Sequence, residues 1–385
     1  MTLPNSQFSI PTRVRFGAGE VAGVGECLSA IGSKRPLLIT DSGMLGTTAF
    51  RKMEAALNES GAGWSLFGEA LPNPTEENVE QASNRFRSDD SDSLIGFGGG
   101  SALDVAKAVA LRVSFEGPLE GYQPNPQGPP LAPVIAIPTT AGTGSEVGRA
   151  TVVVLRSTGH KEVLFDPRLM PQFAILDPEL TVDLPRGLTA ATGMDAFTHC
   201  LESYVSPVFH PVADSIAIGG MESIVEHLPA AYEDGKNLEA RGYMMIAAMM
   251  GALAFQKDLG AAHAMAHPLS TLCGVHHGLA NAVVLPYVME FNVETVETKY
   301  ARVGRIFDPG LTGLPEGEAA RSAIESVKDL NSRIGIASNL RELGVAEKDL
   351  APLAEAASKD GCRLTNPREC GRVEFRELFQ KAYSG

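Results

Sequence analysis

Cysteine, tryptophan and basic residues are scarce in this chain of 385 residues, which has five cysteines and one tryptophan. The cysteines are scattered and form no Cys-x-x-Cys pair, so we expect packing thiols in a reducing compartment rather than a disulfide framework. Lysine and arginine total 32 against 46 acidic residues, a formal net charge of −14, which disfavours nucleic acid as a partner. The N-terminal segment lacks the basic stretch and apolar run of an export signal, so we expect a cytoplasmic protein.

A membrane segment is also not expected, although residues 259–289 contain no Asp, Glu, Lys or Arg. This stretch carries four histidines, two prolines and an asparagine. In lipid each of these polar groups would need a partner. A buried interior that contains polar chemistry is therefore the better interpretation.

Two domains are expected, an α/β domain over residues 1–185 and an all-helical domain over residues 186–385. Before about residue 178, short apolar runs alternate with helical patterns, which is typical of a mostly parallel sheet covered on both faces. The predicted strands are 37–40, 93–97, 134–137, 151–155 and 173–176. Beyond residue 184, apolar residues recur near the helical period, which predicts helices over 188–204, 211–232, 237–255 and 318–334.

A glycine-rich turn follows the second predicted strand. Gly98, Gly99, Gly100 and Ser101 lead directly into a helical pattern, where glycine lets the backbone approach a diphosphate and the helix start attracts it. The loop at 138–146 and Asp41 follow two other strands, and the carboxyl ends of parallel strands share one edge. Asp41 favours NAD over NADP because a carboxylate accepts hydrogen bonds from ribose hydroxyls and repels a 2′-phosphate. Alternatively, the glycine segment is only a tight turn, and Asp41 only caps a turn or helix.

A histidine cluster predicts a metal site. Asp195 and His199 are four residues apart, as are His263 and His267, so each pair shares one helix face. A carboxylate with imidazoles and no thiolate suits Fe(II), Zn or Mn(II). Any one histidine alone could be a hydrogen-bonded core residue, but several within an uncharged stretch would each cost desolvation without a task. Spacing leaves open which of six candidates bind: Asp195, His199, His263, His267, His276 and His277.

Taken together, four motifs resemble the iron-containing (group III) alcohol dehydrogenase family: GGGSALDVAK, PTTAGTGSE, GMDAFTHCLESYVS and HAMAHPLSTLCGVHHGLANAVVLP. The resemblance implies a dehydroquinate synthase-like fold, in which an NAD-binding α/β domain precedes a helical domain that carries Fe(II) or Zn. It implies the metal ligands Asp195, His199, His263 and His277, with His267 as a catalytic residue in the proton relay. It also implies a homodimer or larger homo-oligomer. The cofactor-binding residues implied are Asp41, Asn73, Gly98, Gly99, Gly100, Ser101, Ala102, Thr139, Thr140, Thr143, Lys161 and Leu180.

The substrate is expected to be a small alcohol or aldehyde. Arg149 and Lys257 are cationic residues near the motifs, and together they could hold a carboxylate at the far end of a short substrate. The patterns LTAATGMDAxxHC and AFQKxLG are similar to those of 4-hydroxybutyrate dehydrogenases, which implies an ω-hydroxy acid. Alternatively, Lys257 pairs with Asp258 or points into solvent, and the substrate is a simple primary alcohol or a diol of the lactaldehyde type. A dehydroquinate synthase-like lyase and a nucleotide sensor without catalysis are further alternatives.

Overall fold

The computed structural model describes residues 8–115, 117–157, 159 and 161–385. Contacts divide the chain into two compact units. The first, here the α/β unit, comprises Ile10–Leu184 and Lys236–Met245. The second, here the helical unit, comprises Pro185–Gly235 and Ile246–Gly385, together with Phe8 and Ser9. Among the described residues, every helix is too short or too polar to span a bilayer.

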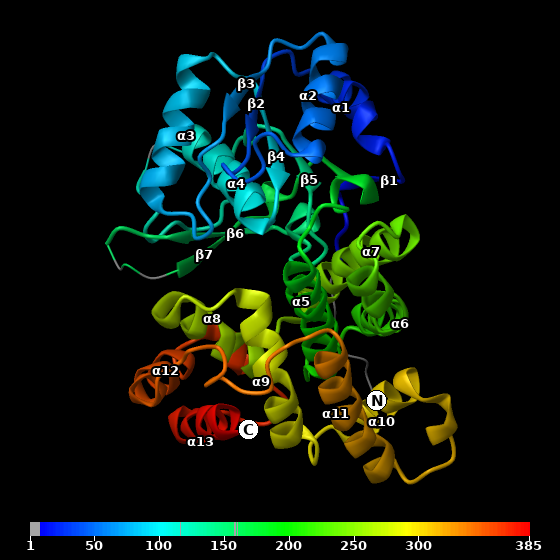
Figure 1. The fold of residues 1–385 in the computed structure, drawn as a ribbon. Helices are drawn as coiled ribbons and strands as arrows, with labels where there is room; N and C mark the ends of the chain where they lie inside the picture. The colour runs from blue at the N-terminus through cyan, green and yellow to red at the C-terminus, as the bar shows by residue number, and fades with distance from the viewer. Residues whose placement is uncertain (1–7, 116, 158, 160) are drawn as a thin grey trace. The chain divides into compact units, whose positions relative to one another are not determined.

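The α/β unit is built on one parallel sheet of six strands in the order β1-β8-β5-β4-β2-β3 (Figure 1). Side chains alternate between its two faces, as strand geometry requires. Leu37 and Ile39 enter the core under α3 and α4, whereas Leu38 enters the core under α1 and α2. The sheet is therefore covered on both faces, as predicted. Its strands are β1 (Arg13–Phe16), β2 (Pro36–Ile39), β3 (Ser65–Phe67), β4 (Ser93–Gly98), β5 (Val134–Pro138) and β8 (Phe173–Leu176), and its helices are α1 (Val24–Ile31), α2 (Thr48–Ser60), α3 (Glu76–Ser88) and α4 (Gly100–Ser114).

One predicted strand lies outside this sheet. The run expected over 151–155 forms β6 (Ala150–Val154), which pairs in antiparallel fashion with β7 (Lys161–Phe165) as a separate ribbon. Its residues alternate between half-buried and buried, which fits a strand with one covered face rather than a central strand of the main sheet. Expecting it in the main sheet was wrong, because a run of β-branched residues does not specify its partner.

In the helical unit, other helices pack around α5, which is buried continuously from Thr189 to Val205. Helix α9 crosses α5 so closely that a Cβ atom on Gly278 would lie 2.2 Å from the carbonyl oxygen of Ala191. This glycine contact brings the start of α9 against the middle of α5. The long helices are α5 (Arg186–Val205), α6 (Pro211–Glu233), α7 (Leu238–Ala254), whose first part belongs to the α/β unit, α8 (Ala261–Cys273), α9 (His277–Asn292), α10 (Glu297–Phe307), α11 (Glu316–Arg333), α12 (Leu350–Ala357) and α13 (Arg372–Ser384).

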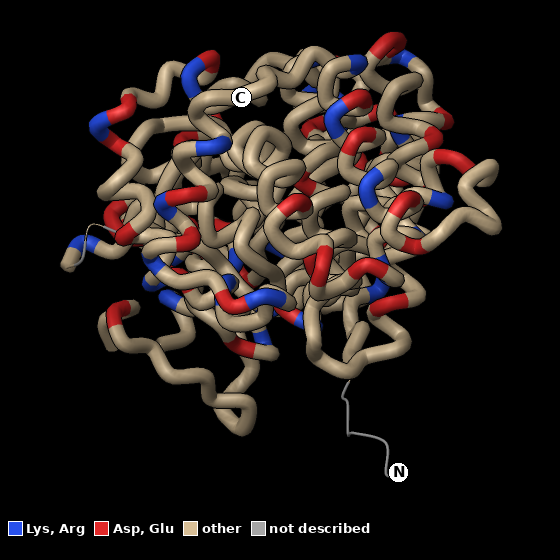
Figure 2. The backbone as a smooth tube through the Cα atoms, turned by 90° about the horizontal axis from the view of Figure 1, so that it is seen from below, with Lys and Arg blue, Asp and Glu red and all other residues tan. Residues whose placement is uncertain are grey.

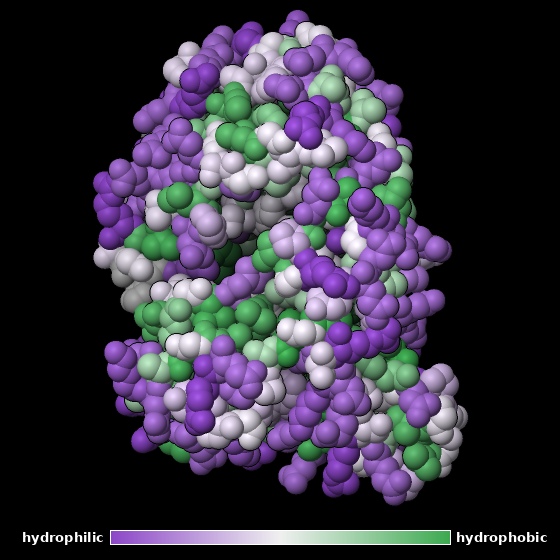
Figure 3. All heavy atoms as spheres, in the orientation of Figure 1, coloured by the Kyte–Doolittle hydropathy of each residue, from purple (hydrophilic) through white to green (hydrophobic). Residues whose placement is uncertain are grey.

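Charged residues of both signs are intermixed along the chain in the view of Figure 2. Hydrophilic side chains cover most of the face drawn in Figure 3, with apolar residues in scattered patches. Among the described residues, the view of Figure 2 therefore shows no concentration of one charge sign.

Candidate metal centre and cofactor loops

Three helices of the helical unit bring metal-ligating side chains together. Asp195 comes from α5, His263 from α8 and His277 from α9. Their donor atoms all lie within 4.8 Å of one another. The Nε2 atoms of His263 and His277 lie 3.8 and 3.5 Å from Oδ1 of Asp195.

His199, the fourth residue implied by the resemblance, lies beside this group. It follows Asp195 by one turn of α5, and its ring stacks on His263 with the centroids 4.6 Å apart. Its donor atoms are outside the 4.8 Å group of Asp195, His263 and His277. The charge of His199 nevertheless lowers the pKa of Asp195.

The electrostatics of the group favour a bound cation. Burial opposes ionisation of Asp195, but His199, His277, His263 and a hydrogen bond from Asn281 outweigh it and lower its pKa from 3.8 to about 2. Desolvation keeps the pKa of His277 well below its ordinary 6.5, so its ring is neutral near pH 7. A carboxylate and a neutral imidazole are the forms that ligate a metal.

The hydrogen bonding of Asn281 tests whether an ion fits. Its Nδ2 atom lies 2.8 Å from Oδ1 of Asp195 and 3.2 Å from Nε2 of both His263 and His277. An amide nitrogen has two hydrogens and cannot serve three acceptors. At least one of these three atoms therefore receives no hydrogen from Asn281, which leaves room in the group for a divalent cation. The oxygen and nitrogen donors fit Fe(II) or Zn.

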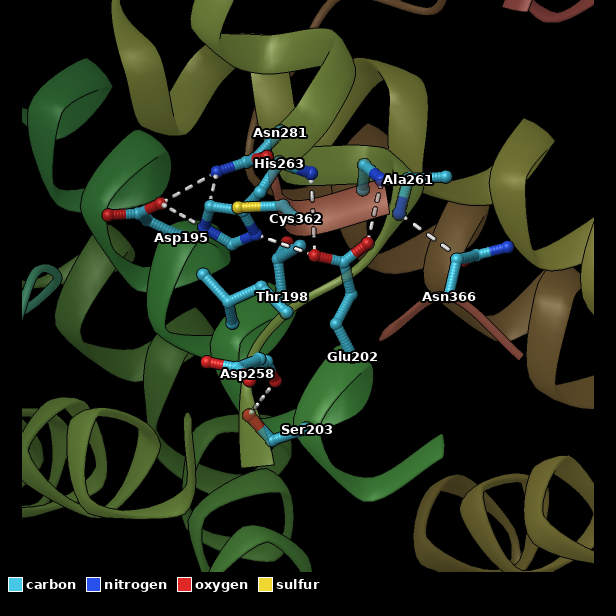
Figure 4. A network of polar contacts seen from close by, with 12 residues as sticks. Asp195, Thr198, Glu202, Ser203, Asp258, Ala261, His263, Asn281, Cys362 and Asn366 are labelled. Atoms are coloured by element: carbon cyan, nitrogen blue, oxygen red, sulfur yellow. Dashed lines mark hydrogen bonds and ion pairs between the residues drawn. The ribbon is translucent and has the colours of Figure 1, made fainter. Parts of the chain in front are cut away.

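The carboxylate of Glu202 orients His263, one of the three candidate ligands (Figure 4). Oε2 of Glu202 lies 2.6 Å from Nδ1 of His263, and Oε1 accepts the backbone N–H of Ala262 at 2.6 Å. Although burial opposes protonation, the hydrogen bond and charge of Glu202 raise the pKa of His263. Such outer carboxylates fix the tautomer of a ligating imidazole, leaving Nε2 to face the metal.

Sequence reasoning missed Glu202 and Asn281. Each carries a signal in its spacing, because Glu202 follows Asp195 by two helical turns and Asn281 follows His277 by one. Both therefore lie on the helix faces that carry Asp195 and His277.

His267, the predicted catalytic residue, is partly exposed and adjoins the group. Its ring stacks on that of His277, with centroids 5.3 Å apart and planes at 12°. Its Nδ1 lies 2.7 Å from Oδ2 of Asp360, a second carboxylate that sequence reasoning missed. His276, also a candidate by spacing, is exposed at the start of α9.

In the α/β unit, three strands deliver the predicted cofactor loops to one edge of the sheet. Asp41 lies just beyond β2, the glycine turn ends β4, and Thr139 follows β5, with its N–H bonded to Gly98 at 2.9 Å. Gly98 has a φ of +145°, and a Cβ atom there would lie 3.5 Å from Oδ2 of Asp41. A Cβ on Gly100 would come within 2.7 Å of Cγ2 of Thr143. These contacts place Asp41, the glycine turn and Thr143 close together at the start of α4.

The other predicted cofactor residues are less uniform. Ser101 bonds the carbonyl of Pro72 at 2.6 Å, next to the exposed Asn73. Thr140 adjoins Gly99, and Ala102 lies in the first turn of α4. Lys161 is half-buried on β7, where burial lowers its pKa. Leu180 is buried in the apolar core of the sheet.

The two predicted substrate residues have different surroundings. Lys257 is buried, with its Nζ 2.5 Å from Oδ1 of Asp214, so its charge is already balanced inside the helical unit. Being buried, it does not point into solvent, which was one of its expected alternatives. Arg149 is half-buried with its guanidinium 4.7 Å from the ring centroid of Phe165. Among the described residues, no carboxylate pairs with it within 4 Å.

Comparisons with known proteins agree with a metal group in the helical unit and cofactor loops in the α/β unit. Residues 11–178 match the model for iron-containing alcohol dehydrogenases, and residues 189–383 match the C-terminal model of that family. The chain is 38% identical to a 4-hydroxybutyrate dehydrogenase of Cupriavidus necator, with 96% of this chain and 98% of that protein covered. It is 37% identical to a 1,3-propanediol dehydrogenase of Klebsiella pneumoniae, with 98% of each chain covered. A solved 1,3-propanediol oxidoreductase superposes with a TM-score of 0.95 at 38% identity, covering 98% of this chain and 99% of that one. The protein thus belongs to the iron-containing alcohol dehydrogenase family.

Proposed function

We propose that this enzyme interconverts a short ω-hydroxy acid, such as 4-hydroxybutyrate, and its semialdehyde by NAD-dependent hydride transfer. The convergence of Asp195, His263 and His277 in a chain of this family carries the reaction class. The 38% identity with a 4-hydroxybutyrate dehydrogenase is compatible with an acid substrate, but a 1,3-propanediol dehydrogenase is equally similar, so the choice of the acid rests on Arg149.

The two cofactors have separate binding residues. Asp195, His263 and His277, with His199 alongside, would hold iron, and the loops with Asp41, the glycine turn and Thr139–Thr140 would hold NAD. When bound, iron supplies a Lewis acid for the substrate oxygen, and NAD supplies the hydride acceptor. The role of Glu202 is to keep the Nε2 lone pair of His263 available to the metal.

The alcohol proton leaves through His267 in this proposal. Its ring lies against His277 and is partly exposed, so it can exchange protons with water while adjoining the metal group. General acid-base transfer by a positioned imidazole contributes about 10²–10⁴-fold to a rate.

Arg149 is the residue proposed to bind the substrate carboxylate. It is half-buried, and its guanidinium can offer two parallel hydrogen bonds. Lys257 is no longer a candidate for this role, since Asp214 already neutralises it. A neutral substrate such as 1,3-propanediol is the second candidate, favoured by relatives of comparable identity with that activity in their names.

Substrate profiles of the wild type and an Arg149→Gln variant test the choice. We expect the wild type to oxidise 4-hydroxybutyrate with a higher kcat/KM than 1,3-propanediol or 1-butanol. Loss of a charge-assisted hydrogen bond worth about 1.5–3 kcal/mol should lower kcat/KM of the variant for the acid by about 10–100-fold. Its efficiency toward the neutral alcohols should change little. Arg156→Gln, at an exposed arginine just beyond β6, is the matched control. A wild type that prefers the diol would support the second candidate instead.

A further inference from the structure

Helix α8 carries two imidazoles that are each held by a carboxylate. Nδ1 of His263 lies 2.6 Å from Glu202, and Nδ1 of His267 lies 2.7 Å from Asp360. The first of these imidazoles joins the metal group with Asp195 and His277, whereas the second lies in a separate, half-buried group with Asp360 and Cys362. Asp360 therefore has the geometry of an outer partner, but it serves a residue outside the metal group.

Asp360 is itself held in place by the backbone. It caps the short helical turn Gly361–Thr365, and its Oδ1 accepts the N–H of Cys362 at 2.9 Å. Its other oxygen, Oδ2, is left for His267. Burial would raise the pKa of Asp360, but the hydrogen bond to His267 and the backbone contact outweigh it and lower the pKa below 3.8. An ionised carboxylate only accepts hydrogen bonds, so the proton of the pair lies on Nδ1 of His267.

The arrangement determines which nitrogen of His267 can react. With Nδ1 donating to Asp360, the lone pair of the neutral ring is on Nε2. Stacking on His277 fixes the plane of the ring, and the contact with Asp360 fixes its rotation within that plane. Orientation and tautomer are thus set together.

We infer that Asp360 is a positioning residue that holds His267 with Nε2 ready to accept the alcohol proton. This inference rests on the proposed relay role of His267. An Asp360→Asn change tests it sharply, because the asparagine oxygen can still cap Cys362 while its NH₂ group meets Nδ1 of His267. The imidazole proton is then forced onto Nε2, where it blocks proton acceptance.

A double-mutant cycle with His267→Ala measures the effect. In the otherwise wild-type protein, Asp360→Asn should lower kcat by about 10–100-fold, with KM and metal content changed less than about twofold. In the His267→Ala background the same change should alter kcat less than about twofold, because the residue acts through the imidazole. The matched control is Asp308→Asn, since Asp308 caps the turn Pro309–Leu311 in the same way at an exposed position. It should leave kcat unchanged.

The outcomes separate this inference from the proposed function. If Asp360→Asn lowers kcat equally with and without His267, or removes the metal, then Asp360 is only a structural cap and the inference is overturned. If His267→Ala leaves kcat unchanged, the relay itself is wrong, and the inference falls with it.

A tautomer measurement needs no variant of Asp360 to fold. In ¹⁵N-histidine-labelled, zinc-loaded protein, two-bond ¹H–¹⁵N spectra report which ring nitrogen carries the proton. The His267 signals, identified by their loss in His267→Ala, should show a proton on Nδ1 and a bare Nε2. A proton on Nε2 and a bare Nδ1 would refute the inference.

Discussion

Glu202 has two tasks that one substitution can expose. Its Oε1 accepts the N–H of Ala262 at the start of α8, and its Oε2 lies 2.6 Å from Nδ1 of His263. The Glu202→Gln variant keeps one acceptor oxygen, which can serve the backbone. Its NH₂ group then meets Nδ1 of His263 and moves the ring proton to Nε2, the nitrogen next to Asp195.

Two measurable losses follow from this change. Outer-partner substitutions cost about 10–100-fold in metal affinity, which corresponds to about 1.4–2.8 kcal/mol. The Glu202→Gln substitution also removes a charge at the N-terminus of α8 and a charge-assisted hydrogen bond. The free energy of unfolding of the metal-free variant should therefore be about 2 kcal/mol lower than that of the metal-free wild type. Metal affinity is measured by competition with a chelator, and stability by urea denaturation of the metal-free protein.

Glu233→Gln provides the control, because the exposed side chain of Glu233 pairs with Arg333 at the surface. It should change the free energy of unfolding by less than about 1 kcal/mol and leave metal affinity unchanged. A folded Glu202→Gln protein that binds metal as tightly as the wild type would refute the tautomer argument.

Two further predictions concern stability. Gly278→Ala should lower the free energy of unfolding by about 3 kcal/mol or more, because the new Cβ would meet the Ala191 carbonyl at 2.2 Å. Gly187→Ala, in α5 with open space around it, should be neutral or stabilising by up to about 1 kcal/mol, and urea denaturation compares the two. Burial raises the pKa of Glu146 from 4.5 to about 7. The protonated side chain therefore contributes to folding stability below pH 4.5, and this contribution is lost as the pH rises through 7. Between pH 5.5 and 8, Glu146→Gln should gain about 2 kcal/mol in unfolding free energy relative to the wild type; parallel pH profiles would refute this.

The sequence predicted the elements that have a strong local pattern. The helices expected over 188–204 and 211–232 are α5 and α6, and the glycine turn lies between β4 and α4 as predicted. The strand β1 was missed because its sequence, RVRF, is charged and mostly exposed at the edge of the sheet. The separate ribbon of β6 and β7 could not be foreseen, because pairing is decided by contacts distant in sequence.

The same limit applies to the site. Spacing of four residues identified Asp195 and His263 as candidates, because ligands on one helix face leave a local signal. The partners that define their chemistry come from elsewhere in the chain. Glu202 is 61 residues from His263, and Asp360 is 93 residues from His267. Lys257 shows the converse, since its half-buried partner Asp214 is 43 residues away and already balances its charge.

The contrast between His263 and His267 shows how one helix turn can support two kinds of chemistry. Both rings direct Nδ1 to a carboxylate, so both leave Nε2 as the reactive nitrogen. Nε2 of His263 faces Asp195 and the amide nitrogen of Asn281 inside a buried group, away from water. His267 is partly exposed, so its lone pair can exchange a proton with water. In the proposed function, the buried ring of His263 therefore binds the metal, and the more exposed ring of His267 carries the proton.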